Sequence, residues 1–535
     1  TRWATHGRVT EANAHPHFDP TEKVQIVLNG IVENWTELRK RFTAAGAHFS
    51  SETDAEVVAH LVAHHYDGDL VAAVREAFAE LRGHYAFVAI SADEPDLIVA
   101  ARKECPLVVG IGDGEVFVAS AISAFLRETR RVQPVENGDI VAIRADGATF
   151  FDAAGAPVDR AIETVEWDDE AAEKGGYDTF MLKEIYEQPD AIAETIADRV
   201  VEDDSVDLGD FIDDATLAAA NRIVIVACGT SYHAGLIGRY AIESWARLPV
   251  EMDVASEYRY RDPVLGENDI VIGITQSGET ADTLAAMRLA HESGAKVVAV
   301  TNVMGSQATR DADAVLFTRA GLEIGVAATK TFVAQVAAMY LIALKLAELK
   351  GTLDADQRRE LIAELRRMPH YMDEAIPGDD ERAEKIAERW HKSEFFLYLG
   401  RNVGLGVALE GALKLKEVSY IPTDAYAAGE MKHGPIALLD EQTPVVCVAT
   451  DSPVLAKVAS NIAEVRARGA HVIAVVTEGC DAVEADELLY VPRTHWLLQP
   501  LLAVVPLQLL AYHIARKRGL NVDQPRNLAK TVTVE

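Results

Sequence analysis

Residues 269–280 read DIVIGITQSGET, an apolar run that ends in a hydroxyl-rich loop, and residues 281–294 then have the spacing of a helix. A near-continuous apolar run before a loop and a helix is typical of a parallel strand covered on both faces. Comparable apolar runs lie at residues 221–229, 295–302 and 314–318. We therefore expect a doubly wound α/β domain around this segment.

The same order of strands recurs further along the chain, at an offset of about 174 residues, which is the signature of an internal duplication. The later apolar runs occupy residues 395–401, 444–450, 471–479 and 488–493. We predict two sister doubly wound α/β domains, at 215–350 and 380–519. The remaining residues, 520–535, form a polar tail that is too short to fold alone.

The N-terminal part has closely spaced strand-like runs bounded by Gly, Asp and Pro, together with two segments of helical spacing. The runs are residues 24–30, 84–91, 96–102, 107–112 and 115–120, and the helical segments are 54–66 and 69–81. This pattern predicts an α+β domain with antiparallel sheet, at residues 1–145. Residues 146–214 have a charged centre without apolar periodicity, as expected of a connector.

The 535 residues include 84 acidic and 51 basic side chains, a formal charge of −33. This charge repels the phosphate backbone of nucleic acid, so we expect no nucleic acid partner. It also suits a protein that stays soluble at high salt. The cysteines at 105, 228, 447 and 480 form no CxxC pair. Neither a disulfide framework nor a zinc site is expected, and a reducing cytoplasm fits.

One apolar segment, WLLQPLLAVVPLQLLAYHIA at 496–515, is long enough to span a bilayer. Two prolines, two glutamines and a histidine interrupt it, so we expect a buried helix and no membrane association. The first residues, TRWATHGRVTEANAHPH, contain no apolar stretch of the kind that a signal peptide requires.

Two hydroxyl-rich loops follow apolar strands and open helices: TQSGET at 275–280 and CGTSYHAG at 228–235. Hydroxyl groups and backbone N–H groups at a helix N-terminus can bind an anion such as phosphate. Hydroxyls at such positions can equally serve as helix caps. Two such loops at neighbouring strand ends favour a ligand site. The chain has no GxxxxGK[ST] motif, so a P-loop nucleotide enzyme is not expected.

Three ionisable residues, Glu410, Lys414 and Glu417, share one helix face at spacings i, i+4 and i+7. They fit a solvated ladder of salt bridges or, because apolar residues surround them, a buried group suited to proton transfer. His433 stands in a loop rich in Gly and Pro, where a histidine fits either a structural role or a functional one. Lys530, in the tail, fits a surface lysine or one that forms a Schiff base with a ketone.

The strings TQSGETADTL, EIGVAATKTF, ALEGALKLKE, YAAGEMKHGP and PRNLAKTVTVE resemble the isomerase half of the glucosamine-6-phosphate synthase family, the glutamine–fructose-6-phosphate aminotransferases. That half consists of two sugar-isomerase (SIS) domains and a catalytic tail. RWATHG, NAHPH, VLNGIVEN and SETDAEV resemble the family's class II glutaminase domain, an N-terminal-nucleophile α+β sandwich. YDTFMLKEIYEQP, at 177–189, resembles its interdomain segment.

The resemblance implies a cytoplasmic homodimer that converts fructose 6-phosphate and glutamine to glucosamine 6-phosphate and glutamate, in amino-sugar biosynthesis leading to UDP-GlcNAc, with no cofactor or metal. The residues implied for the sugar phosphate are Thr230, Ser231, Thr275, Gln276, Ser277, Thr280 and Val326. Lys530 is implied as the Schiff-base lysine, Glu417 as the base between C1 and C2, and Lys414 as a second acid or base. His433 of the partner subunit is expected to assist ring opening.

For glutamine, the resemblance implies Arg2, Thr5, His6, Asn29, Gly30 and Asp54, with Asn29 as an oxyanion donor and Trp3 as the gate of an ammonia channel. The family's cysteine nucleophile stands well before the RWATHG string, whereas this chain begins beside it. We therefore expect an incomplete, N-terminally truncated glutaminase domain in a polypeptide that uses only free ammonia.

Two other classes remain open. An SIS-type sugar-phosphate isomerase or deglycase would keep the two loops but lack RWATHG, VLNG and SETD, which are present. A sugar-phosphate-sensing regulator would need a DNA-binding output module, and no helix-turn-helix pattern is visible.

Overall fold

The computed structural model describes residues 10–165, 174–201, 205–209 and 211–533. The chain divides into two compact units. One comprises residues 1–170 with 279–281 and 531–535, and the other comprises 171–278 and 282–530.

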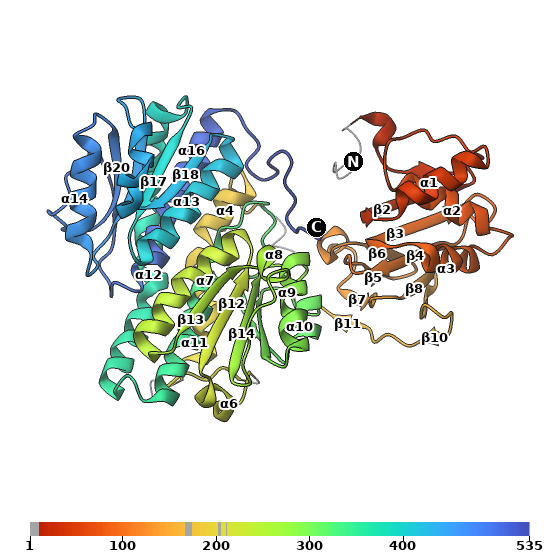
Figure 1. The fold of residues 1–535 in the computed structure, drawn as a ribbon, viewed down its shortest axis with the longest axis horizontal. Helices are drawn as coiled ribbons and strands as arrows, with labels where there is room; N and C mark the ends of the chain where they lie inside the picture. Colours follow the sequence, from red (N-terminus) through yellow and green to blue (C-terminus); the bar gives the residue numbers. More distant parts are fainter. Residues whose placement is uncertain (1–9, 166–173, 202–204, 210, 534–535) are drawn as a thin grey trace. The chain divides into compact units, whose positions relative to one another are not determined.

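The N-terminal unit contains two antiparallel sheets, ordered β1-β2-β3-β4-β8-β9-β10 and β11-β7-β5-β6 (Figure 1). The strands are β1 (His17–Phe18), β2 (Val24–Val32), β3 (Gly83–Ser91), β4 (Ile98–Lys103), β5 (Val108–Ile111), β6 (Val116–Ala119), β7 (Arg131–Pro134), β8 (Ile140–Arg144), β9 (Gly147–Phe151), β10 (Pro157–Val158) and β11 (Glu163–Thr164). The helices are α1 (Trp35–Ala44), α2 (Glu56–His65) and α3 (Leu70–Glu80).

Alternation along β3 builds the two cores of this unit. Tyr85, Phe87 and Ala89 join the core that contains α2 and α3. Ala86, between them, joins the second core, which also contains residues of β5 and β8. Because successive side chains of a strand point to opposite faces, one strand serves both layers. The α+β architecture is confirmed.

The connector does not begin at residue 146, where we expected it. Strands β9 and β10 pair antiparallel with β8 and with each other and so extend the large sheet. The compact N-terminal unit runs to residue 170. The segment GATFFDAAGAPV carries few long apolar side chains because it forms the edge of the sheet, and its composition therefore resembles that of a linker.

The second unit contains two parallel five-stranded sheets with the same order, β13-β12-β14-β15-β16 and β18-β17-β19-β20-β21 (Figure 1). The first sheet comprises β12 (Arg222–Ala227), β13 (Val250–Val254), β14 (Asp269–Thr275), β15 (Lys296–Thr301) and β16 (Ala314–Phe317). The second comprises β17 (Phe396–Gly400), β18 (Thr423–Ala427), β19 (Pro444–Ala449), β20 (His471–Thr477) and β21 (Glu487–Val491). The predicted pair of doubly wound domains is confirmed.

Helices of the second unit, such as α7, α9 and α14, lie against the faces of the two sheets (Figure 1). The helices of this unit are α4 (Phe180–Tyr186), α5 (Gln188–Ile196), α6 (Asp214–Ala219), α7 (Gly229–Ala241), α8 (Ala255–Tyr258), α9 (Ala281–Glu292), α10 (Gln307–Asp311), α11 (Lys330–Lys350), α12 (Ala355–Trp390), α13 (Val403–Ser419), α14 (Leu455–Arg466), α15 (Gln499–Ala503) and α16 (Val505–Lys517). One apolar core includes residues of α7, α11, α13 and α16. The two doubly wound folds therefore share an interior.

Two segments have the apolar composition of a membrane span. The segment at 496–515 forms most of α15 and α16, which are almost entirely buried and have prolines in their first turns. Helix α11 is long and apolar enough to cross a membrane by composition, but 83% of its most apolar window is buried inside the fold. Both segments lie in the core, and the prolines at the starts of α15 and α16 leave no hydrogen bond unmade.

Candidate functional site

Helix α13 carries the predicted ionisable face and buries it. Glu410 and Lys414 have side chains that are 0% and 1% exposed, and the Lys414 Nζ lies 3.4 Å from Glu410 Oε1. The same ammonium lies 2.7 Å from Glu417 Oε2, whose side chain is 21% exposed. The three residues therefore form a buried group that opens outward at Glu417, and not a solvated ladder.

The first SIS fold completes this group through α7. Thr230 donates its hydroxyl to Glu410 Oε1 at 3.0 Å and accepts a hydrogen bond from Lys414 Nζ at 3.2 Å. His233 Nδ1 lies 2.8 Å from Glu410 Oε2. Helices of both folds thus meet at one buried carboxylate. His233 was missed in the sequence, although it lies three residues after Thr230, on the same face of a helix.

The charges of the group reinforce one another. Burial opposes the charge of Lys414, but Glu410 and Glu417 outweigh it and raise the pKa of Lys414 above its usual value. Burial would also neutralise Glu410, but Lys414 and His233 outweigh it and lower the pKa of Glu410. Lys414 is therefore an ammonium at neutral pH, able to donate hydrogen bonds and to stabilise the Glu417 carboxylate.

The two hydroxyl-rich loops lie at the same edge of the first sheet. Strands β12 and β14 pair in parallel, with Ala227 opposite Ile274, so the loops that follow them are neighbours. Ser231 is nearly buried in the first turn of α7 and accepts a hydrogen bond from Gln335 at 3.1 Å. Such an edge, outside the carboxyl ends of the strands, is the usual ligand position of this fold class.

The second loop is held in place by close packing at Gly278 and by hydrogen bonds to the Thr275 side chain and to the segment after β15. Gly278 has φ +70°, and a Cβ there would lie 1.9 Å from Ser306 Oγ, so the position admits only glycine. Gly278 N donates to Thr275 Oγ1 at 3.2 Å, and Asn302 N donates to the Gln276 carbonyl at 3.1 Å. Ser277 and Thr280 are half-buried in this loop before α9. The structure thus gathers the predicted phosphate-loop residues in one fixed turn.

Lys530 is not a surface lysine. Its Nζ donates to the Gly325 carbonyl at 2.8 Å and to the carboxylate of Glu323, which is fully buried. Glu323 also accepts from Thr329 N at 2.9 Å. Burial would raise the pKa of Glu323, but Lys530 and the backbone donors outweigh it and lower that pKa. Val326, another predicted residue, lies in the same loop.

The Lys530 site and the α13 group are electrostatically linked, because the charge of Glu323 contributes to the raised pKa of Lys414. Glu323 was missed in the sequence. It stood inside the quoted string EIGVAATKTF, but nothing in the local pattern distinguishes this carboxylate from a surface one.

His433 is exposed at the end of a 3₁₀ turn, Ala428–His433. Among the described residues of this chain, no hydrogen bond or ion pair joins it to Glu417 or Lys414. The structure of one chain therefore does not bring His433 to the group, and its role stays a prediction.

The predicted glutamine residues are described only in part, because Arg2, Trp3, Thr5 and His6 lie outside the described residues. Of the others, Asn29 and Gly30 are on β2, and a Cβ at Gly30, with φ +115°, would lie 2.1 Å from the His84 carbonyl. Asp54 is buried, and its Oδ2 accepts from Val32 N at 2.8 Å. The structure thus places Asp54 beside the end of the strand that carries Asn29 and Gly30.

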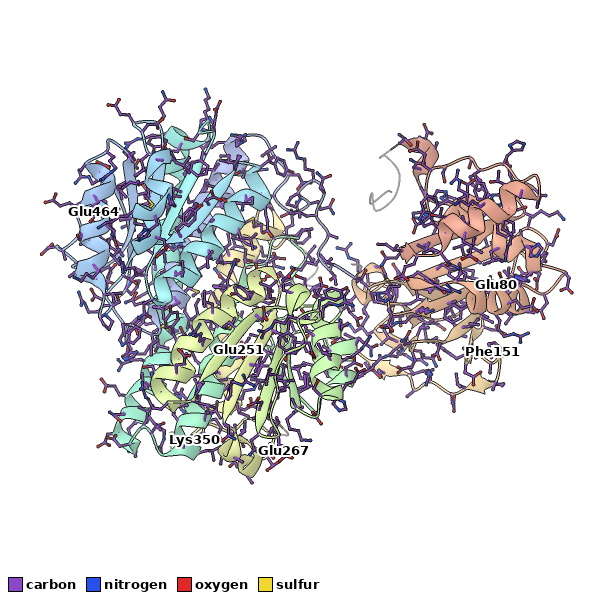
Figure 2. All side chains as sticks on the ribbon, in the orientation of Figure 1. Glu80, Phe151, Glu251, Glu267, Lys350 and Glu464 are labelled. Carbon is purple, nitrogen blue, oxygen red and sulfur yellow. The ribbon has the colours of Figure 1, made fainter. Side chains whose placement is uncertain are left out.

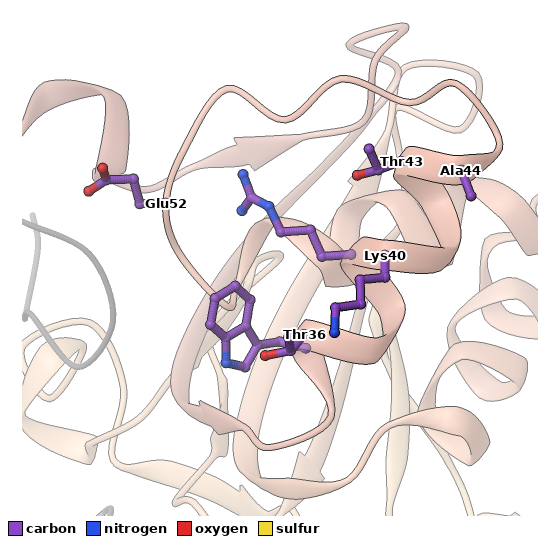
Figure 3. A pocket seen from close by; sticks show the side chains of 7 residues that line it. Thr36, Lys40, Thr43, Ala44 and Glu52 are labelled. Carbon is purple, nitrogen blue, oxygen red and sulfur yellow. The ribbon is translucent and has the colours of Figure 1, made fainter.

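A hollow of about 760 Å³ lies on the N-terminal unit, over α1 (Figure 3). Its lining residues are Trp35, Thr36, Arg39, Lys40, Thr43, Ala44 and Glu52. It includes none of the predicted site residues. Across the residues that the structure describes, no group of three or more His, Cys, Asp or Glu side chains could hold a metal ion.

The chain combines two kinds of domain that are found in known families. The SIS domain family matches residues 216–345 and 391–517, and the glutamine amidotransferase domain family matches residues 2–127. Together with the buried group shared by the two SIS folds, these matches define the class: a glutamine amidotransferase joined to a pair of sugar-isomerase domains.

Curated relatives specify the family within this class. The whole chain is 48% identical to 88% of the glutamine–fructose-6-phosphate aminotransferase (isomerizing) of Caldanaerobacter subterraneus subsp. tengcongensis, and 50% identical to 88% of that of Mycolicibacterium smegmatis. The solved C-terminal domain of glucosamine-fructose-6-phosphate aminotransferase from Francisella tularensis is 39% identical, with a TM-score of 0.64, and matches 66% of this chain and all of that one. The chain belongs to the glutamine–fructose-6-phosphate aminotransferase family.

Proposed function

We propose that this protein makes glucosamine 6-phosphate from fructose 6-phosphate, with ammonia taken from glutamine. The observation that carries the proposal is the pairing of Lys530 with Glu323 and Gly325 beside the buried group of α7 and α13. A lysine held at a sugar-phosphate site, next to a carboxylate and an ammonium, suits Schiff-base and proton-transfer chemistry. The glutamine amidotransferase domain disfavours the alternative of an SIS isomerase that uses no glutamine.

In this proposal the phosphate of the sugar binds at the loops of β12 and β14. The donors are the backbone N–H groups at the starts of α7 and α9 and the side chains of Ser231, Thr275, Gln276, Ser277 and Thr280. Thr230 is also committed to Glu410 and Lys414, so it would connect the sugar to the buried group. Val326 would line the site beside Lys530.

Lys530 then attacks the C2 ketone of the open-chain sugar and, with loss of water, forms a Schiff base. Ammonia displaces Lys530 from C2 and leaves an imine there. Glu417 moves a proton from C1 to C2, and the proton of the O1 hydroxyl passes to the C2 nitrogen, which leaves an aldehyde at C1 and an amine at C2. The balance is fructose 6-phosphate and ammonia giving glucosamine 6-phosphate and water. Lys414, held as an ammonium by its two carboxylates, would donate a hydrogen bond to a sugar oxygen beside Glu417.

The finer assignments of the other unit and of the assembly are also proposals. Glutamine would bind Arg2, Thr5, His6, Asn29, Gly30 and Asp54, with Trp3 gating the passage of ammonia. The chain would act as a homodimer, with His433 of the partner subunit assisting ring opening. A cytoplasmic location fits the four free cysteines, of which Cys105 and Cys447 are buried, with pKa values raised by burial to about 12.

The test is product formation by the purified 535-residue polypeptide. We expect glucosamine 6-phosphate from fructose 6-phosphate and ammonium salts, because the residues proposed for amination lie in the second unit. Lys530→Ala should abolish amination while fructose 6-phosphate still binds. Amination by Lys530→Ala at the parent rate would overturn the proposal.

A further inference from the structure

Helix α4, which lies in the connector between the glutaminase-like and SIS domains, contacts the tail that carries Lys530. The carboxylate of Asp523 accepts hydrogen bonds from Phe180 N at 3.1 Å and Met181 N at 2.9 Å, at the start of this helix. The Asp523 carbonyl accepts from Val326 N at 3.0 Å. Asp523 thus joins the tail both to α4 and to the loop that receives Lys530.

Glu184, on the same helix, binds the backbone N–H groups of that loop. Its Oε1 accepts from Ile324 N at 2.6 Å and from Gly325 N at 3.0 Å. The side chain is buried, and a Cβ added to Gly325 would lie 2.7 Å from Glu184 Oε2. The carboxyl group of Glu184 therefore lies directly against the loop backbone, and any side chain at position 325 would displace it.

Lys530 binds the other side of the same loop segment, through the Gly325 carbonyl and the Glu323 carboxylate. The backbone of residues 323–325 thus lies between Glu184 and Lys530. A shift of this backbone would move both acceptors of the lysine together, and a misplacement of about 1 Å at a reacting group can cost on the order of a hundredfold in rate.

We propose that Glu184 is a positioning residue for Lys530, and that α4, through Glu184 and Asp523, clamps the receiving loop and the tail in one geometry. This inference rests on the proposed role of Lys530 as the Schiff-base lysine. It gives the connector a part in the isomerase chemistry, beyond that of a link between domains.

The surroundings of Glu184 favour the neutral form of its carboxyl group more than exposure to water would. In the described part of the chain its Oε2 is buried without a hydrogen-bond partner, which is costly for a carboxylate. Burial raises the pKa of Glu184 to about 7, Glu323 adds to the rise, and Lys530 opposes it. A glutamine at position 184 keeps an oxygen that can accept from the two loop N–H groups but carries no charge. The Glu184→Gln variant therefore distinguishes the effect of these hydrogen bonds from the effect of the charge.

The experiment compares borohydride trapping of the sugar at Lys530, and the kcat and KM of ammonium-dependent synthesis, in variants of position 184. We expect Glu184→Ala to reduce trapping and kcat at least about tenfold while the KM for fructose 6-phosphate changes less than about threefold, since the phosphate loops are untouched. Glu184→Gln should stay within about threefold of the parent in both. Glu194→Ala, at an exposed position of the neighbouring α5, is the matched control and should change nothing.

Each outcome has one meaning. Normal trapping and kcat in a folded Glu184→Ala protein would overturn the clamp. If that variant fails to fold, Glu184→Asp, which withdraws the carboxyl group by one methylene, takes its place, and parent-like trapping in it would equally overturn the clamp. A parent protein that traps no sugar at Lys530 would instead contradict the proposed function, so the two failures are distinguishable.

Discussion

At the scale of single residues, the site depends on buried charges that neutralise one another. The side chain of Glu410 has no exposed surface, and Lys414 balances its charge. Its carboxylate also accepts a hydrogen bond from Thr230 and is hydrogen-bonded to His233 Nδ1. Removing one member of such a set leaves the others buried and uncompensated, which costs far more than the loss of a surface pair. The group therefore bears on the stability of the second unit as well as on chemistry.

Lys414→Met should destabilise the second unit by about 3–5 kcal/mol, because it leaves Glu410 buried without its cation. The free energy of unfolding in denaturant is the measurement. Adding Glu410→Gln to Lys414→Met should recover part of the loss.

The control for this prediction is Lys345→Met. Lys345 pairs at 3.1 Å with Asp214, whose side chain is 60% exposed, so its loss should cost about 0–1 kcal/mol. Equal effects of the two lysine substitutions would show that the buried charge of Glu410 needs no compensation.

Sequence reasoning identified those candidate site residues that belong to a local sequence pattern. It missed those whose role depends on contacts between residues far apart in the chain. Glu410, Lys414 and Glu417 share a helix face that spacing alone reveals. Glu323 and Glu184 are nearly 140 residues apart, and only folding brings them to one loop. No local signal marks either carboxylate.

At the scale of secondary-structure elements, apolar runs predicted the buried parallel strands well. The edge strands β13 and β18 were not predicted, because VEMDV and TDAYA are partly exposed and carry charged residues. The long α12 was not predicted either, since Pro369 and Pro377 stand inside it. The predicted start of the connector was wrong because β9 and the edge strand β10 have the composition of a linker.

The loop after β14 offers a test at this scale. Gly278→Ala should raise the KM for fructose 6-phosphate, because the new methyl group would meet Ser306 and displace the loop that we expect to bind phosphate. Overpacking of this kind costs about 1–3 kcal/mol.

Gly294→Ala separates the clash from backbone strain. Gly294 has φ +84°, also in the left-handed region, but nothing lies within 4 Å of a Cβ there. This variant should lose some stability and keep its KM. If both alanine variants keep the parent KM, the loop does not bind the sugar phosphate.

At the scale of the whole molecule, the acidic excess of the sequence is carried by side chains at the surface, such as the labelled Glu267 and Glu464 (Figure 2). The duplicated SIS folds share one apolar core, and their joint site uses α7 from one fold and α13 from the other. His433 is exposed within a single chain. We therefore expect the His433 that completes the site to come from a second chain.

Subunit exchange tests the shared site. Inactive His433→Ala and inactive Glu417→Gln chains, mixed in equal amounts, should regain about one-quarter of the parent activity, because half of the dimers are mixed and each has one intact site. Mixed dimers that form and stay inactive would place both residues in one subunit.

The most direct test of the central claim is the site of covalent capture. The protein is incubated with fructose 6-phosphate, reduced with borohydride and digested, and the peptides are analysed by mass spectrometry. We predict that the reduced sugar phosphate is attached to Lys530, in the tail peptide, and that Lys530→Ala carries no label. A label on Lys414 or on any other lysine, with Lys530 unmodified, would contradict the account.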